Sequence, residues 1–588
     1  MNIKDIIEEK LSEVILNVYQ LKEINLEVQE NKTEYEGDFT IVTFPLVKQL
    51  KKNPESIGVE LGESLTAQTD LFESFNVIKG FLNVKVKNQF FVDQFKSISE
   101  DFSNIDKKNA TVMVEYSSPN TNKPLHLGHI RNNLLGFSVA QILKEAGYDV
   151  IKSQIINDRG IHICKSMLAW EKFGNGETPE TTHTKGDKFV GNYYVEFDKN
   201  YKKEISDLVE RGIGEDQAKK EAPLMKEAQK MLQDWENGDE KVRSLWAEMN
   251  SWVYKGFNET YKRLGVDFDQ VQYESNTYIL GKDLIQEGLD KGILYQKEDG
   301  SVWCDLTDEG LDQKLLLRSD GTSVYMTQDL GTAVERFKQN DIQKLIYTVG
   351  NEQDYHFQVL FKILKKLGYA WADQLFHLSY GMVELPEGKM KSREGTVVDA
   401  DDLMQEMYET AKSKAQELGK LETLSDQERE SSYETVGLGA LKYFMLKVDP
   451  KKKMLFNPAD SVDFNGNTGP FIQYTYARIQ SLLSKANYEY KEASAVELNE
   501  FEKELIMLLA NYKTIVERAA EALSPALVAN YVYDLVKSYN SFYQNQSTPI
   551  VKLEEGDLKQ TRLNLSDLTA KTIKKSLGLL GIGTVNRM

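Results

Sequence analysis

The stretch 111–156 restricts the fold of this chain more than any other part of the sequence. An apolar run at 111–116 predicts a buried strand, and a turn with two prolines follows it. Residues 127–146 have the apolar spacing of a helix, and 149–156 predict the next strand. This strand, turn, helix, strand order predicts a Rossmann-like, nucleotide-binding α/β core with a parallel sheet.

Two histidines lie at the start of the predicted helix. His126 and His129 are three positions apart, so both imidazoles share one face of the first turn. A helix N-terminus offers unpaired N–H groups and a positive dipole end, which together favour a phosphate. Gly128 leaves room for a base or ribose near the backbone. The motif predicts a triphosphate site, but packing or an incidental metal site would also explain a histidine pair.

A second motif occurs at 388–398, where Gly388 and Gly395 bracket a basic segment. It predicts a flexible loop that can close over phosphates. With both motifs in this order, the chain resembles the class I aminoacyl-tRNA synthetases. The resemblance implies that the catalytic residues are His126, His129, Lys123 and Lys389, and that Leu127, Gly128, Met390, Lys391 and Ser392 bind ATP.

Polar residues suited to binding an arginine side chain occur in three segments. A planar, permanently charged guanidinium is best held by carboxylates that accept paired N–H bonds, with an aromatic ring against its face. Glu115, Asp329 and Tyr325 offer these groups, and Asn120 and Gln353 offer partners for an amino acid's ammonium and carboxylate. By spacing alone, Tyr325 and Asp329 are more simply explained as a surface pair on one helix.

Several short segments are similar to the arginyl-tRNA synthetases and not to the class I enzymes for glutamine, cysteine or methionine. They are 118–120, 123–126, 157–160, 325–329 and 353–356. The resemblance implies that arginine is bound by Glu115, Asn120, Tyr325, Asp329 and Gln353, with the guanidinium on Asp329, Glu115 and Tyr325.

The same resemblance implies the reaction. L-arginine is activated with ATP and Mg²⁺ to the adenylate, and the arginyl group then passes to the terminal ribose of tRNA(Arg), with bound tRNA required for activation.

The second motif departs from the family's pattern at one position. Ser392 replaces the family's final lysine, and Lys391 comes one position earlier. In arginyl enzymes a lysine just before the histidines is thought to substitute, and Lys123 occupies that place. Whether Lys391 shares the task stays open.

The length and composition fit a cytoplasmic enzyme of several domains. A chain of 588 residues is too long to fold around a single hydrophobic core. Its content of 41% hydrophobic and 28% charged residues is ordinary for a globular protein. No apolar run is long enough for a membrane span, so no membrane partner is expected. The net charge of −19 argues against indiscriminate nucleic-acid binding, and no DNA partner is expected. Cys164 and Cys304 predict neither a disulfide framework nor a zinc site.

Three domains are predicted from the pattern of elements. Residues 1–108 form an α+β domain that resembles the family's tRNA-elbow-binding domain. Residues 109–403 form the catalytic domain, with a helical insertion over 171–250. Residues 404–588 are almost wholly helical and resemble the anticodon-binding bundle. A monomer is expected, because no heptad pattern or exposed apolar stripe occurs.

Four residues of the C-terminal domain are candidates for contact with the anticodon. Aromatic rings can stack on unpaired bases, and an arginine can bind phosphate. The candidates are Phe471, Tyr474, Tyr476 and Arg478. Each aromatic residue is equally well explained as part of the core of a helix bundle.

Two other functions compete with this interpretation. Another class I synthetase, or a nucleotidyltransferase of the same fold, would lack the carboxylate pair Glu115 and Asp329. A synthetase-like regulatory or RNA-binding protein without catalysis would be expected to have a damaged motif, whereas both histidines and Lys389 are present.

Overall fold

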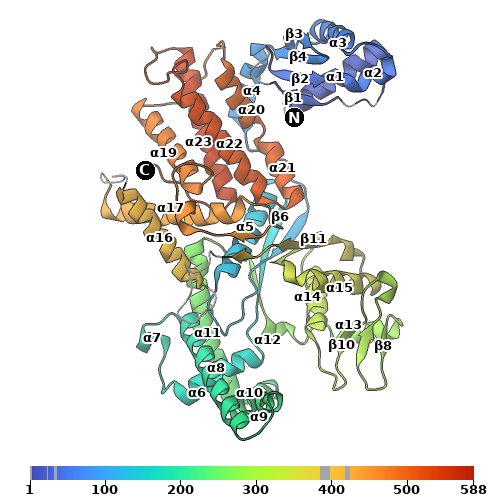
Figure 1. Ribbon diagram of the computed structural model, residues 1–588, viewed down its shortest axis with the longest axis vertical. Coiled ribbons are helices and arrows are strands. Elements are labelled where there is room, and N and C mark those ends of the chain that lie inside the picture. Colours follow the sequence, from blue (N-terminus) through green and yellow to red (C-terminus); the bar gives the residue numbers. More distant parts are fainter. Residues whose placement is uncertain are drawn as a thin grey trace.

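The computed structural model describes residues 3–22, 24, 26–31, 36–384, 398–417, 424–494 and 496–588. A central sheet has the helical C-terminal part on one side and two long insertions on the opposite side (Figure 1). A small N-terminal domain adjoins the C-terminal part (Figure 1). In the described part of the chain, no helix is long and apolar enough to cross a membrane.

The N-terminal domain packs helices on an antiparallel sheet. Its helices α1 (Ile3–Tyr19) and α3 (Pro54–Gln68) contact each other, and α3 lies against the sheet. The strands, in the order β1-β2-β4-β3, are β1 (Val28–Glu30), β2 (Phe39–Val42), β4 (Phe81–Val86) and β3 (Phe72–Ile78). Short α2 (Phe44–Leu50) joins β2 to α3, and α4 (Asn88–Asp101) leads toward the catalytic core. The predicted α+β character of this region is confirmed.

The central sheet has five strands, all parallel, in the order β12-β11-β5-β6-β7. They are β5 (Thr111–Glu115), β6 (Asp149–Ile156), β7 (Gln270–Tyr273), β11 (Lys344–Gly350) and β12 (Leu375–Tyr380). The strand order reverses between β5 and β11, where Val114 pairs with Ile346. In open sheets of this kind, ligands bind beyond the carboxyl ends of the strands at this switch point.

The predicted elements of the first unit agree closely with the structure. The helix predicted over 127–146 is α5 (Leu127–Glu145), and the second strand has the predicted bounds. Buried apolar residues on β5, such as Val112 and Val114, account for the strand, and the Rossmann-like fold class is confirmed.

Two long insertions separate successive strands of the central sheet along the chain. Between β6 and β7 the chain forms α6 (Ile161–Phe173), α7 (Pro179–Thr182), α8 (Gly186–Glu210), α9 (Glu215–Glu221), α10 (Pro223–Glu236) and α11 (Glu240–Leu264). Between β7 and β11 it forms α12 (Glu274–Thr277), α13 (Lys282–Asp290), α14 (Tyr325–Gln339) and a small antiparallel sheet of β8 (Leu294–Gln296), β9 (Val302–Cys304) and β10 (Lys314–Leu317). The small sheet was not predicted, because strands of three or four residues give little periodicity.

After β11 the chain forms α15 (Asp354–Lys366), and after β12 it forms the short β13 (Val383–Glu384), which pairs with β14 (Met454–Leu455). The C-terminal part is helical: α16 (Ala400–Glu417), α17 (Asp426–Leu446), α18 (Pro458–Ser461), α19 (Gly469–Lys485), α20 (Glu500–Ala510), α21 (Tyr512–Ala522), α22 (Pro525–Gln544) and α23 (Asp557–Leu579). This confirms the predicted helical character of the C-terminal domain, in which the two-residue β14 is a small exception.

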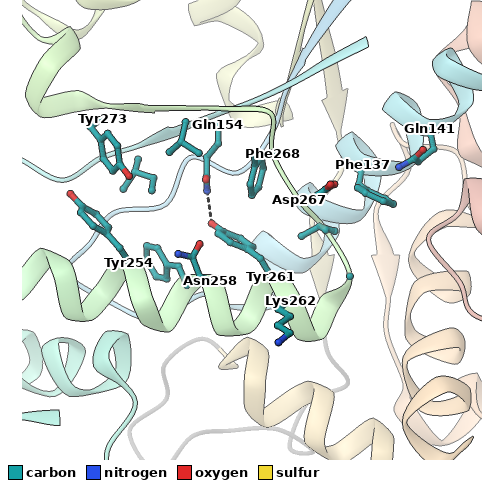
Figure 2. Close-up of a pocket in the computed structure, with 15 residues that line it drawn as sticks. Phe137, Gln141, Gln154, Tyr254, Asn258, Tyr261, Lys262, Asp267, Phe268 and Tyr273 are labelled. Carbon is teal, nitrogen blue, oxygen red and sulfur yellow. Dashed lines mark hydrogen bonds between the residues drawn. The ribbon is translucent and has the colours of Figure 1, made fainter. Parts of the chain in front are cut away.

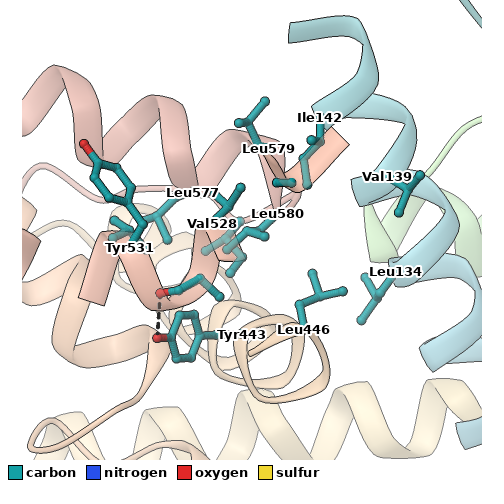
Figure 3. Close-up of a cluster of buried hydrophobic side chains, with 14 of the residues drawn as sticks. Leu134, Val139, Ile142, Tyr443, Leu446, Val528, Tyr531, Leu577, Leu579 and Leu580 are labelled. Carbon is teal, nitrogen blue, oxygen red and sulfur yellow. Dashed lines mark hydrogen bonds between the residues drawn. The ribbon is translucent and has the colours of Figure 1, made fainter. Parts of the chain in front are cut away.

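The catalytic helix α5 shares one core with the C-terminal helices (Figure 3). Leu134 of α5 lies beside Leu446 of α17, and Ile142 lies beside Leu579 of α23 (Figure 3). Each of these side chains is at most 6% exposed. The helix whose first turn carries the two histidines is therefore held rigidly by the C-terminal domain.

Candidate active site

The residues predicted to bind substrates follow the carboxyl ends of the parallel strands. Glu115 ends β5, Asn157 follows β6, and Gln353 lies just after β11. Asn120 pairs with Asn157 in an isolated parallel bridge, which draws the turn after β5 toward β6. The structure thus brings Glu115, Asn120 and Gln353 to one edge of the sheet, at the switch point.

The two histidines cap the start of α5. His126 is the N-cap residue, and its Nδ1 accepts a hydrogen bond from the Gly128 backbone N–H at 3.1 Å. The Nδ1 of His129 accepts from the His126 backbone N–H, also at 3.1 Å, and the ring centroids are 3.9 Å apart. A Cβ on Gly128 would lie 3.0 Å from the His126 ring, so this glycine makes room for the ring itself.

This arrangement fixes the protonation of both rings. An Nδ1 that accepts a hydrogen bond carries no proton, so the proton of the neutral ring is on Nε2. Burial, with Lys123 nearby, lowers the pKa of His126 to about 4. Burial and His126 lower the pKa of His129 well below its ordinary value. Both histidines are therefore neutral near pH 7 and have an Nε2–H available to donate to a phosphate.

Only some of the other residues predicted for the ATP site lie in the part of the chain that the structure describes. Lys123 is exposed, and it is near enough to both histidines to lower their pKa values. Leu127 is 4% exposed, and its N–H donates to Val398 O at 3.0 Å. The other predicted residues, Lys389, Met390, Lys391 and Ser392, lie outside the described residues.

Glu115 is buried and bound by an internal arginine. Arg336 of α14 donates from Nη1 to Glu115 Oε2, and its Nε donates to Gln272 Oε1 at 2.8 Å. Arg336 is only 1% exposed. The carboxylate predicted to bind the substrate guanidinium thus already has a guanidinium partner, which no motif in the sequence indicates.

The other predicted arginine ligands are accessible. Asp329 lies one turn after Tyr325 on α14, and its Oδ2 is 2.7 Å from His356 Nε2. Tyr325 is 75% exposed. Asn120 and Gln353 are also exposed. Tyr325 is therefore accessible to a ligand at the edge of the sheet, and Asp329 is partly exposed there with His356 as its partner.

Glu274 is a candidate that the sequence analysis missed. It is the first residue after β7 and is 9% exposed. Burial raises its pKa to about 7, while Arg159 opposes and Asp158 and Asp329 add to the rise. The next residue, Ser275, is fixed by Asp158, which accepts from its N–H and its hydroxyl at 2.8 Å each. Recognising β7 as a strand of the parallel sheet would have pointed to the carboxylate that follows it.

A cavity of about 620 Å³ lies apart from these residues, where α11 packs beside β6 and β7 (Figure 2). Its walls include Tyr254, Phe268 and Gln154, and none of the predicted site residues line it. Gln154 Nε2 donates to the Tyr261 hydroxyl at 2.6 Å, and that hydroxyl is 2.8 Å from Ser117 Oγ. The cavity is therefore linked to the turn after β5 without forming part of the phosphate site.

The four anticodon candidates lie on α19 in different environments. Arg478 donates to Asn540 Oδ1 at 2.6 Å, and its guanidinium carbon is 4.8 Å from the Tyr474 ring centre. Phe471 and Tyr474 are half-buried, but Tyr476 is 5% exposed. Tyr476 therefore belongs to the core of the bundle, one of the two explanations left open for these aromatics.

Three family models match the chain. The model for class I tRNA synthetases (R), catalytic domain, matches residues 95–457, the arginyl tRNA synthetase N terminal domain matches 1–86, and the DALR anticodon binding domain matches 472–588. Together with the parallel sheet and the histidine pair at the switch point, these matches define a class I aminoacyl-tRNA synthetase.

Relatives that match along the full length of the chain show which family within this class it belongs to. The arginine–tRNA ligase of Flavobacterium psychrophilum is 56% identical over 100% of both chains, and that of Bacteroides thetaiotaomicron is 54% identical over 99% of this chain and 100% of its own. The Thermus thermophilus arginyl-tRNA synthetase structure superimposes with a TM-score of 0.78 at 25% identity, covering 100% of both chains. The chain belongs to the arginyl-tRNA synthetase family.

Proposed function

We propose that this chain is an arginine–tRNA ligase. It activates L-arginine with ATP to arginyl-adenylate, and it transfers the arginyl group to the terminal ribose of tRNA(Arg), releasing AMP and pyrophosphate. Relatives of the same activity match along the whole chain. The structural observation that carries the proposal is the pair of neutral histidines that cap α5 at the switch point, together with carboxylates at the carboxyl ends of the strands that are suited to a guanidinium.

In the activation step, the arginine carboxylate attacks the α-phosphate and pyrophosphate leaves. Little proton transfer is needed, so catalysis consists of positioning and stabilising charge on the phosphates. His126 and His129 donate from Nε2, and Lys123 adds a positive charge; Lys389, with Met390, Lys391 and Ser392, completes the ATP site. The described donors are nitrogen atoms. Mg²⁺ would therefore be held mainly by phosphate oxygens and water, where it neutralises phosphate charge.

The arginine site combines predicted and newly found residues. Asp329 and Glu274 are the carboxylates for the guanidinium, with Tyr325 against its face, because both acids lie at the carboxyl edge near each other. Glu115 shares its charge with Arg336 and is suited to a single contact with the α-ammonium. Asn120 and Gln353 bind the remaining polar atoms of the amino acid backbone.

The tRNA spans the three domains 1–108, 109–403 and 404–588. Phe471, Tyr474 and Arg478 offer stacking faces and a cation on α19. Tyr476 supports that helix from the core. The enzyme acts as a cytoplasmic monomer, and neither DNA nor a membrane is a partner.

The proposal is tested by charging total tRNA with each amino acid in turn, in the presence of ATP and Mg²⁺. Pyrophosphate exchange is measured with and without tRNA. Charging by arginine alone is expected, with exchange appearing only when tRNA is added. Charging by a different amino acid refutes the arginine site, and the absence of all charging favours a non-catalytic RNA-binding protein.

A further inference from the structure

The peptide that carries His126 is held by a segment far along the chain. Two backbone hydrogen bonds, of 3.0 and 2.9 Å, join 125–127 to 398–400. His126 lies opposite Asp399 in an antiparallel bridge between the two segments. The position of the His126 backbone, from which its ring projects, therefore depends in part on where 398–400 lies.

Two lysines of α8 form ion pairs with this segment, Lys185 and Lys188, and Lys185 is the more buried of the two. Lys185, the N-cap residue of α8, has its Nζ 2.5 Å from Asp401 Oδ2 and 3.2 Å from Asp187 Oδ2. It also donates to Thr260 Oγ1 of α11 at 2.5 Å. Thr260 in turn donates to Asp401, at 3.1 Å. One ammonium thus joins two helices of the insertion to the first turn of α16.

The surroundings make this cluster rigid. The Asp187 side chain is 1% exposed, and those of Lys185 and Asp401 are 20% and 28% exposed, so water and salt screen the pairs weakly. A Cβ on Gly256 would lie 2.4 Å from Asp187 Oδ1, which shows how closely α8 and α11 approach. Close packing of this kind allows little adjustment.

The same helix also contacts the two residues just before the segment 125–127. A Cβ on Gly191 of α8 would lie 2.8 Å from Pro124 Cδ and 3.5 Å from the Lys123 Cα. The first turns of α8 therefore contact residues beside both segments of the antiparallel pairing.

We propose that Lys185 is a positioning residue for amino acid activation: through Asp401 it holds 398–400, and thereby sets the position from which the His126 ring projects. The helical insertion thus has a part in catalysis without touching a substrate. The inference rests on the proposed function, because it takes His126 as a donor to ATP. A misplacement of about 1 Å at such a donor costs on the order of a hundredfold in rate.

The test is a double-mutant cycle on tRNA-supported, arginine-dependent pyrophosphate exchange. Lys185→Met is expected to lower kcat by on the order of a hundredfold with little change in the KM for arginine. Lys185→Arg, which keeps the charge, is expected to restore most of the rate. In a His126→Ala background, Lys185→Met is expected to cause almost no further loss, because the group that it positions is gone.

Controls separate positioning from stability. Lys172→Met removes a comparable ion pair of the insertion, with Glu227 at 2.7 Å, and should leave exchange unchanged. If Lys185→Met does not fold, Asp401→Asn replaces it in the same cycle. Full multiplication of the two losses, or an unchanged rate in Lys185→Met, overturns the inference while the proposed function stands. Absence of exchange in the unaltered enzyme overturns the proposed function instead.

Discussion

The Nδ1 atom of His129 accepts the backbone N–H of His126 at 3.1 Å, so the second histidine of the motif caps the residue that carries the first. His126 uses its own Nδ1 in the same way, toward Gly128. In each ring one nitrogen therefore stabilises the start of α5, and the other nitrogen is available to bind the substrate.

This division of roles predicts different effects for two substitutions of His126. Asparagine can retain the acceptor that caps α5, but it has no atom at the Nε2 position. His126→Asn should therefore keep thermal stability and lose on the order of a hundredfold in kcat. Glutamine places an amide N–H near the Nε2 position, so His126→Gln should retain more activity. Pyrophosphate exchange and thermal unfolding measure the two effects, and equal activity of the variants would contradict the assignment.

The lowered histidine pKa values predict how stability depends on pH. The folded-state pKa of His126 is about 4, below its ordinary value of 6.5, so the folded protein binds fewer protons than the unfolded chain between these values. The free energy of unfolding should therefore fall as the pH drops from 6.5 toward 4. Urea unfolding across this range should show a weaker pH dependence in His126→Asn. An identical dependence in both proteins would show that the ring is not held neutral.

Glu274 predicts a pH dependence of arginine binding. Its pKa is raised to about 7, and only the ionised form attracts a guanidinium. The KM for arginine should therefore rise as the pH falls below about 7, approaching tenfold per pH unit. Glu274→Gln should have a high KM that varies little with pH, whereas the exposed control Glu298→Gln should behave like the unaltered enzyme.

The raised pKa of Glu274 also predicts that replacing this residue increases the stability of the fold. Because folding raises the pKa of Glu274, the folded protein loses stability as the pH rises from 4.5 to about 7, and the whole cost is present above that range. Without arginine, Glu274→Gln should therefore unfold at a higher temperature than the unaltered enzyme at alkaline pH. A lower unfolding temperature would mean that Glu274 has a stabilising partner in the fold.

The pairing of Glu115 with Arg336 predicts strong coupling between them. Removing one member leaves a buried charge without its partner, so Arg336→Met should destabilise the fold by about 3–5 kcal/mol. Replacing both, as Glu115→Gln with Arg336→Met, should cost less than the sum of the single changes. Urea unfolding of the three variants measures the coupling, and additive losses would argue against the ion pair.

Local chemistry explains what could be predicted from the sequence. The helix at 127–145 and the strand at 149–156 were predictable because apolar spacing and a following glycine mark them. The small sheet over 294–317 was not, since its strands are too short to show a period.

The site was predictable only where its residues sit in motifs. Arg336 and Glu115 are 221 positions apart, so their pairing depends on how α14 packs against β5, which no local pattern reveals. Glu274 was missed for a related reason, because its role depends on β7 being the edge strand of the parallel sheet, next to β6. The position of Tyr476 in the core likewise depends on how α19 packs in its bundle.

The most direct test of the account compares arginine with citrulline, which has nearly the same shape but a neutral ureido group. If Asp329 and Glu274 recognise a charged guanidinium, charging of tRNA with citrulline should have a kcat/KM lower by about ten-thousandfold. This preference should shrink in Asp329→Asn. Citrulline charged nearly as well as arginine would contradict the carboxylate site, and with it the structural basis proposed for arginine specificity.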